Sequence, residues 1–170
     1  MEDTWYCVVD GGYHDSYWIN RCRCLSHNLE EEVIMASYNK FQDFVEQLCS
    51  GKHDLTASGH VCKVYLSNTT PDAAADAVKA DLAEFAGGTG YTSGGTDVQN
   101  AVSETTGTAS VTGVDVVWTA GAADWNQFRY VVLYNDTQTS PADPLIAWWD
   151  YGTGLTLGNG ETFTVDFGSS

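Results

Sequence analysis

Cysteine and histidine are the residues of this 170-residue chain with the most distinctive chemistry, because together they can bind zinc. The first 34 residues contain one candidate ligand set: Cys7, Cys22, Cys24 and His27. Structural zinc sites usually supply their ligands as two pairs, each separated by about two to four residues. Here Cys22 and Cys24 have a single residue between them and Cys7 stands far from both. We therefore expect no metal site in this region.

A second group of the same residue types follows further along the chain: Cys49, His53, His60 and Cys62. Its spacing matches no metal site whose geometry can be derived, so we favour a small buried thiol beside loop histidines. A disulfide between Cys49 and Cys62 stays open as an alternative. The five cysteines all lie within the first 62 residues, which is no disulfide framework and favours a reducing cytoplasm.

Catalytic arrangements find little support in the sequence. No histidine follows His60, so residues 61–170 cannot form a Ser-His-Asp triad by themselves. Two carboxylates such as Asp143 and Asp150 could serve a glycosidase, but a chain with 23 acidic residues produces such pairs by chance. No Asp-x-Asp-x-Asp-Gly calcium loop is present. We expect a protein that is not an enzyme, with no catalytic residue, cofactor or bound metal.

Aromatic side chains offer a different chemistry, because exposed rings can stack on sugars. The second half of the chain contains four tryptophans: Trp118, Trp125, Trp148 and Trp149. Neighbouring residues of a strand point to opposite faces, so Trp148 and Trp149 cannot form one platform. Core packing is the favoured interpretation of the tryptophans. For contact with a glycan or a protein partner, we single out Trp125, Trp148 and Tyr91.

The charge of the chain restricts its partners. It has 7 basic and 23 acidic residues, which gives a net charge of −16. Nucleic-acid binding relies on Lys and Arg at phosphates, and anionic membranes attract polybasic segments. We therefore expect neither nucleic acid nor a membrane surface as a partner. No apolar run is long enough to span a bilayer, and the first residues lack the features of a secretory signal.

The elements that would position these residues are mainly strands. Residues 128–134 and 145–151 are strand-length runs of β-branched and aromatic residues, bounded by polar turn residues and two prolines. Both runs are apolar on both faces, which indicates central strands covered on each side. Further short strands are expected at residues 61–67, 96–102, 109–112, 114–119 and 161–167. The dipeptide Asn159-Gly160 predicts a tight turn before the last of them.

One amphipathic helix is expected before the strands. Phe41, Phe44, Val45 and Leu48 recur at helical spacing and would form its buried stripe. Ser37 or Asn39 could cap this helix, and Ser50-Gly51 would end it. Residues 80–85 could form a second, short helix. The glycine-rich residues 87–95 are expected to be a flexible turn that lets Tyr91 pack back onto the sheet.

Together these elements predict a mainly β fold. We expect an antiparallel β-sandwich or jelly-roll-like domain over residues 35–170, with the N-terminal helix packed on it. Residues 1–34 have no clear periodicity, and we interpret them as an irregular extension rich in cysteine and aromatic residues. Because Met35-Ala36-Ser37 has the form of a translation start, residues 1–34 could also be read through from upstream.

From Met35 onward the chain resembles small virion structural proteins of tailed bacteriophages, usually encoded near the head genes. The resemblance rests on an ordered set of segments, which includes KVYLSNT at 63–69, VKADLAE at 78–84, FRYVVLYND at 128–136 and LIAWWDYG at 145–152. Residues 39–48, 53–55 and 90–95 also match. Members of the family continue past the position of Ser170, which implies a chain truncated at its C-terminus.

The resemblance implies a non-enzymatic component of the virion, made in the host cytoplasm. Its most plausible form is a capsid decoration or cement subunit, with the phage capsid protein and further copies of itself as partners. Such oligomers are usually symmetric, so a homotrimer or ring is expected. Two alternatives stay open: a glycan-binding β-sandwich used in adhesion, and a component of the tail.

Overall fold

The computed structural model describes residues 20–21 and 35–168. The chain forms one α-helix, α1 (Gln42–Cys49), and one 3-10 helix, η1 (Lys79–Asp81), in this part. Its strands are β1 (Asn20–Arg21), β2 (Met35–Lys40), β3 (Cys62–Ser67), β4 (Thr96–Asp97), β5 (Ala101–Thr105), β6 (Thr108–Thr112), β7 (Val116–Thr119), β8 (Phe128–Asn135), β9 (Leu145–Leu155) and β10 (Thr162–Val165). The predicted mainly β, antiparallel class with one α-helix is confirmed.

The largest sheet has six strands in the order β1-β2-β9-β8-β3-β4. Its two central strands, β8 and β9, are the two predicted core strands, and they pair antiparallel with Val131 opposite Trp149. The shorter β3 continues the sheet on the other side of β8, with Tyr65 opposite Val132. Both faces of the β8–β9 pair are largely buried, as the apolar runs in these two strands predicted.

Each face of the six-stranded sheet carries its own apolar cluster. On one face Val131 and Trp149 belong to a cluster that also contains Phe163, which comes from the two-stranded ribbon β7–β10. On the other face Trp148 packs against Phe41 with ring centroids 4.4 Å apart, and Leu82 belongs to the same cluster. Trp148 and Trp149 therefore lie in different clusters, as their adjacency in a strand predicted.

Helix α1 is shorter than expected, and it is rotated relative to the predicted stripe. Residues 35–40 form β2, so Ser37 and Asn39 cannot cap the helix, and Phe41 takes the N-cap position without a side-chain cap. Phe44 and Gln47 are buried, whereas Val45 is exposed. Pairing of β2 with β9 fixes where the helix begins, and this long-range constraint overrides the local capping signal. The predicted end at Ser50 is confirmed.

Two further expectations were wrong in detail. Residues 80–85 are not a helix beyond η1, because Leu82 has an extended backbone and Glu84 bridges to Ser67 of β3. The predicted strand 96–102 divides into β4 and the start of β5, because Gln99 has a left-handed φ of 48°. Its backbone N–H donates to Asp97 Oδ1, which stabilises that local turn.

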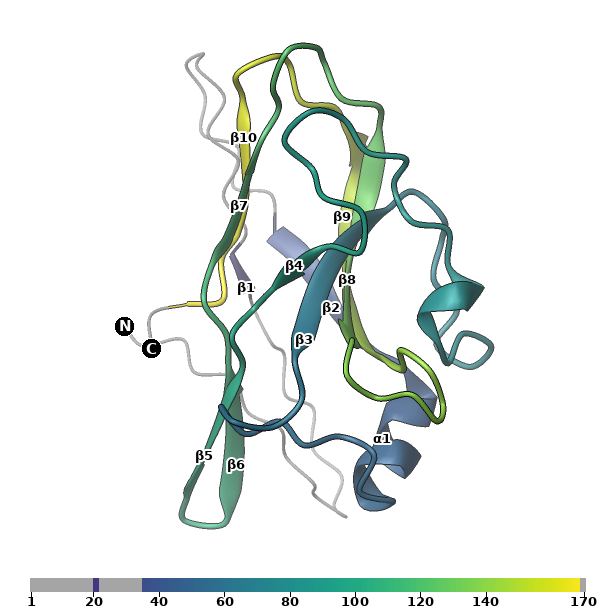
Figure 1. Ribbon diagram of the computed structural model, residues 1–170, viewed down its shortest axis with the longest axis vertical. Coiled ribbons are helices and arrows are strands. Elements are labelled where there is room, and N and C mark those ends of the chain that lie inside the picture. The colour runs from purple at the N-terminus through teal and green to yellow at the C-terminus, as the bar shows by residue number, and fades with distance from the viewer. Residues whose placement is uncertain (1–19, 22–34, 169–170) are drawn as a thin grey trace.

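The hairpin β5–β6 pairs with neither the six-stranded sheet nor the β7–β10 ribbon. Figure 1 shows it extending away from the body of the molecule, at the lower left, beyond the end of the β7–β10 ribbon. Thr105 pairs with Thr108, and the two turn residues, Thr106 and Gly107, both have positive φ, as a type I′ hairpin turn requires. The hairpin is defined hereafter as residues 101–112.

Candidate functional site

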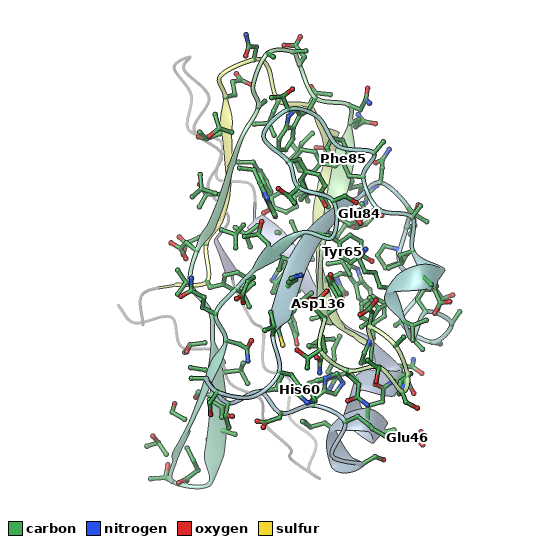
Figure 2. All side chains as sticks on the ribbon, viewed as in Figure 1. Glu46, His60, Tyr65, Glu84, Phe85 and Asp136 are labelled. Atoms are coloured by element: carbon green, nitrogen blue, oxygen red, sulfur yellow. The ribbon has the colours of Figure 1, made fainter. Side chains whose placement is uncertain are left out.

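The end of β8 connects two polar networks. Successive side chains of a strand point to opposite sides, so Tyr134 and Asp136 turn one way and Asn135 the other. Tyr134 and Asn135 are both buried. Figure 2 shows Glu84, Tyr65, Asp136 and His60 following one another along the long axis of the molecule. The two networks below are named after Glu84 and Asn135, the side chains at their centres.

The Glu84 network ties the segment between β3 and β4 to the sheet. Oε1 of Glu84 accepts hydrogen bonds from the Tyr91 hydroxyl at 2.8 Å and from the Gly94 backbone N–H at 2.7 Å. Oε2 lies 2.7 Å from the ammonium group of Lys79, which also lies over the rings of Tyr65 and Tyr134 at 5.1 and 5.4 Å. A charged pair that is mostly buried is thus held by several partners, as buried charges require.

Tyr134 extends this network to Asp136. Its hydroxyl proton is shared between the Gly94 carbonyl at 2.7 Å and Asp136 Oδ1 at 2.9 Å. The other Asp136 oxygen lies 2.7 Å from the Lys63 ammonium group. Burial alone would raise the pKa of Asp136, but the hydrogen bonds from Lys63 and Tyr134 outweigh it and lower the pKa.

The tyrosines of the network are unsuited to proton transfer at neutral pH. Burial, as the largest cause, raises the pKa values of Tyr65, Tyr91 and Tyr134 well above their ordinary range. All three therefore stay protonated at neutral pH. Tyr91 and Tyr134 act as hydrogen-bond donors, and Tyr65 contributes its ring to packing. The Tyr65 hydroxyl is fully buried and has no hydrogen-bond partner among the described residues. The arrangement is that of a structural clamp on residues 79–95.

The Asn135 network lies at the opposite side of the strand end. Asn135 Oδ1 accepts the backbone N–H groups of Thr137 and Gln138 at 3.1 and 3.2 Å. Its Nδ2 lies 3.1 Å from His53 Nδ1 and 3.0 Å from His60 Nδ1. Sequence reasoning treated Asn135 as a turn residue and the two histidines as loop residues, and no local signal connects them.

The residues singled out for glycan or partner contact lie mostly inside the protein. Trp125 and Trp148 are only 3% and 7% exposed. Trp125 Nε1 donates to the Thr89 carbonyl at 3.0 Å. Tyr91 is half-buried and packs against Phe85 and Trp118, as expected for a residue folded back onto the core. A ring that is buried on both sides offers no face for stacking on a sugar.

The remaining candidates for chemistry are also accounted for. Cys49 and Cys62 are free, and burial raises the pKa of the Cys62 thiol to about 12, so it is no nucleophile at neutral pH. Asp150, one half of the suggested carboxylate pair, accepts a two-pronged hydrogen bond from Arg129 at 2.7 and 2.9 Å. This bond lowers the pKa of Asp150, so Asp150 is not a general acid at neutral pH.

Metal-binding clusters and membrane-spanning helices are both absent from the described part of the chain. Residues 20–21 and 35–168 contain no group of three or more His, Cys, Asp or Glu side chains that could hold a metal ion. None of the helices described there has the length and apolar character that a membrane span needs. Cys7, Cys22, Cys24 and His27, the other ligand set considered, lie outside the described residues.

The hairpin presents a surface of a different kind. Glu104 is the only charged residue between Asp97 and Asp115, in a chain with a net charge of −16. The residues of both hairpin strands are exposed or half-buried except Ser110, which is buried, and Val102 is 39% exposed. A nearly uncharged projection on an acidic protein is suited to contact with another protein surface, because little charge must be desolvated there.

The chain matches no protein-family model, no curated protein and no solved structure.

Proposed function

We propose that this chain is a non-enzymatic structural protein of a phage virion, and that it acts as a decoration or cement subunit on the capsid. The observation that carries this proposal is the hairpin: an ordered, exposed and nearly uncharged projection on a protein whose surface is otherwise strongly acidic. The resemblance of residues 35–170 to small virion proteins supports the same assignment.

The architecture suits a rigid particle component. The six-stranded sheet and the β7–β10 ribbon are the two layers of a proposed β-sandwich, with Trp118 and Phe163 of the ribbon buried in the core shared with the sheet. The aromatic core provides the stability, while the hairpin is left to contact neighbours. We propose the capsid protein as the main partner, with a second contact between copies that gives a homotrimer.

The proposal is tested by co-sedimentation of the full chain with purified capsids of the phage that encodes it. Two matched variants each add one negative charge at an exposed valine: Val102→Asp in the hairpin and Val117→Asp on β7, which is 58% exposed. We expect saturable binding at a fixed ratio for the wild type and Val117→Asp. Val102→Asp should bind at least tenfold more weakly.

Two outcomes would contradict the proposal. Absence of wild-type binding to capsids would exclude decoration, and binding to isolated tails instead would assign the chain to the tail. Equal binding by the two variants would show that the hairpin is not the contact. Sedimentation velocity at high protein concentration tests the trimer separately, because a chain that stays monomeric off the capsid does not self-assemble.

A further inference from the structure

The orientation of the Asn135 carboxamide is determined by its surroundings. Its oxygen accepts two backbone N–H groups, from Thr137 and Gln138, so its nitrogen must face the other way. That nitrogen has two hydrogens, and two acceptors lie in front of it, Nδ1 of His53 and Nδ1 of His60. The Lys52 carbonyl lies further off, at 3.5 Å. The amide thus uses both of its hydrogens on two histidines.

This geometry requires both histidines to be neutral. An amide nitrogen has no lone pair to accept a hydrogen bond, so each Nδ1 must be an unprotonated acceptor. The Asp54 backbone N–H also points to His60 Nδ1, at 3.4 Å, which requires the same state of His60. A proton added to either Nδ1 would place one N–H group directly against another. Protonation of either ring therefore replaces an attraction with a repulsion.

His53 is poorly placed to carry a charge. Its side chain is 7% exposed, its ring packs edge-on against Phe44 at 5.1 Å, and its Nε2 is buried without a hydrogen-bond partner among the described residues. Of the titratable groups around it, His60 on the same loop opposes a positive charge and Asp43 on α1 favours one. Asp136, the neighbour of Asn135, is already engaged by Lys63 and Tyr134.

The segment held by this network has few other attachments. Residues 50–61 connect α1 to β3, and the hydrogen bonds that hold them come from Asn135, from Asn100 Nδ2 to the Leu55 carbonyl and from contacts of Val61 with residues 136–137. Helix α1 itself fully buries only Phe44 and Gln47, and Leu48 and Leu55 are partly buried against the same apolar cluster as Phe44. Loss of the two histidine bonds would therefore free this segment more readily than the sheet, whose core is apolar.

We propose that Asn135, His53 and His60 form an acid-sensitive latch, which holds α1 and residues 50–61 against the end of β8 at neutral pH and releases them in acid. Burial, followed by the nearby His60, lowers the pKa of His53 from 6.5 to about 4. A folded-state pKa below the ordinary value means that the unfolded segment binds the proton more tightly. The latch is thus fully effective above about pH 6.5 and is lost as the pH falls toward 4.

The test is backbone hydrogen exchange of the full chain at pH 7.5 and pH 4.5, corrected for intrinsic exchange rates. We expect protection of residues 42–61 to fall at least tenfold at pH 4.5, while β8 and β9 change less than twofold. In His53→Gln, whose carboxamide oxygen can accept from Asn135 but cannot titrate in this range, that loss should be reduced to a few-fold. Equal protection of wild-type residues 42–61 at both pH values would overturn the latch, as would an equal loss in His53→Gln.

A second variant reverses the sign of the effect. In Asn135→Asp a carboxylate oxygen would face both Nδ1 atoms, so protonated histidines would be favoured there. We expect the His53 ring protons, followed by NMR, to titrate at least one pH unit higher in Asn135→Asp than in the wild type. This titration also decides the matter if His53→Gln does not fold. A wild-type His53 that titrates near pH 6.5 with residues 42–61 still protected would contradict the proposal.

Discussion

The two-stranded ribbons β7–β10 and β5–β6 have the same backbone arrangement, but only β7–β10 is packed into the core. Both β7–β10 and β5–β6 are two-stranded antiparallel pairs with side chains that alternate between two faces. In β7–β10 one face carries Val116, Trp118, Phe163 and Val165, all buried. In β5–β6 neither face carries a residue larger than valine apart from Glu104. Side-chain volume, rather than strand pairing, decides which ribbon joins the core.

The physical reason is the balance between buried area and ordering. A two-stranded ribbon is at best marginally stable in water, so it needs a packed face to be held firmly. Aromatic residues contribute several times the buried area of alanine or serine. Trp118 and Phe163 are a cross-strand pair of the ribbon whose rings are nearly parallel, with centroids 6.2 Å apart and 9° between the planes. Phe163 also contacts Phe128 and Tyr151 of the six-stranded sheet, and these contacts hold the β7–β10 ribbon against it. The hairpin has no such aromatic pair, and its surface is the one proposed above for contact with a partner.

The largest expected effect is on the packed ribbon. Phe163→Ala removes a ring that is 1% exposed and contacts Trp118, Phe128 and Tyr151. We expect it to lower the free energy of unfolding by about 3–5 kcal/mol. Thr164→Ala, on the opposite face of the same strand, should change it by less than about 1 kcal/mol. Urea denaturation measures the free energy of unfolding of both variants. Similar values for the two would show that the buried face of β10 contributes no more to stability than its outer face.

A second pair of variants compares glycines from the body and the hairpin. Gly90 and Gly107 both have positive φ, so alanine costs about 1–2 kcal/mol at either site. A Cβ on Gly90 would also lie 1.9 Å from the Thr119 carbonyl oxygen, whereas one on Gly107 would meet nothing within 4 Å. We expect Gly90→Ala to cost roughly 1–3 kcal/mol more than Gly107→Ala.

Thermal unfolding followed by tryptophan fluorescence separates these two glycine variants, because the described tryptophans lie in the body and not in the hairpin. Gly90→Ala should lower the midpoint clearly, and Gly107→Ala only slightly. A larger effect of Gly107→Ala would mean that the hairpin is part of the cooperative core.

The smallest expected effect lies in the hairpin itself. Val102→Ala removes an exposed side chain that is not part of either apolar cluster, so the free energy of unfolding should change by less than about 0.5 kcal/mol. Val117→Ala, the exposed valine of the packed ribbon, should behave in the same way. A cost above about 1 kcal/mol for Val102→Ala in urea denaturation would show that the hairpin packs on the body.

Local patterns predicted the central elements well. Strands β3, β8, β9 and β10 lie where runs of β-branched and aromatic residues predicted them, because these side chains pack well on the buried surface of a pleated sheet. The Asn159-Gly160 turn is also present, with a positive φ at Gly160. Errors occurred where a distant contact overrides a local preference. Pairing of β2 with β9 removed the expected helix caps, and the Glu84 bridge to Ser67 prevented a helix at 80–85.

The candidate sites were less predictable than the fold. The tryptophans were correctly expected to favour the core, and their burial removes Trp125 and Trp148 as exposed platforms. Glu84, in contrast, has no distinguishing sequence context, and its importance comes from Lys79, Tyr91 and Gly94 meeting at one carboxylate. Such convergence depends on how residues 79–94 fold back on themselves between β3 and β4, which no periodic pattern encodes.

The sequence by itself determined the mainly β class, the two central strands and the opposite directions of Trp148 and Trp149. These features follow from residue type and from the two-residue period of a strand. Only the tertiary structure decided that the β7–β10 ribbon is packed and the hairpin is free, and that Asn135 meets His53 and His60, which are 82 and 75 residues away along the chain. Those contacts depend on strand register and loop closure over long separations, and local preferences do not specify either.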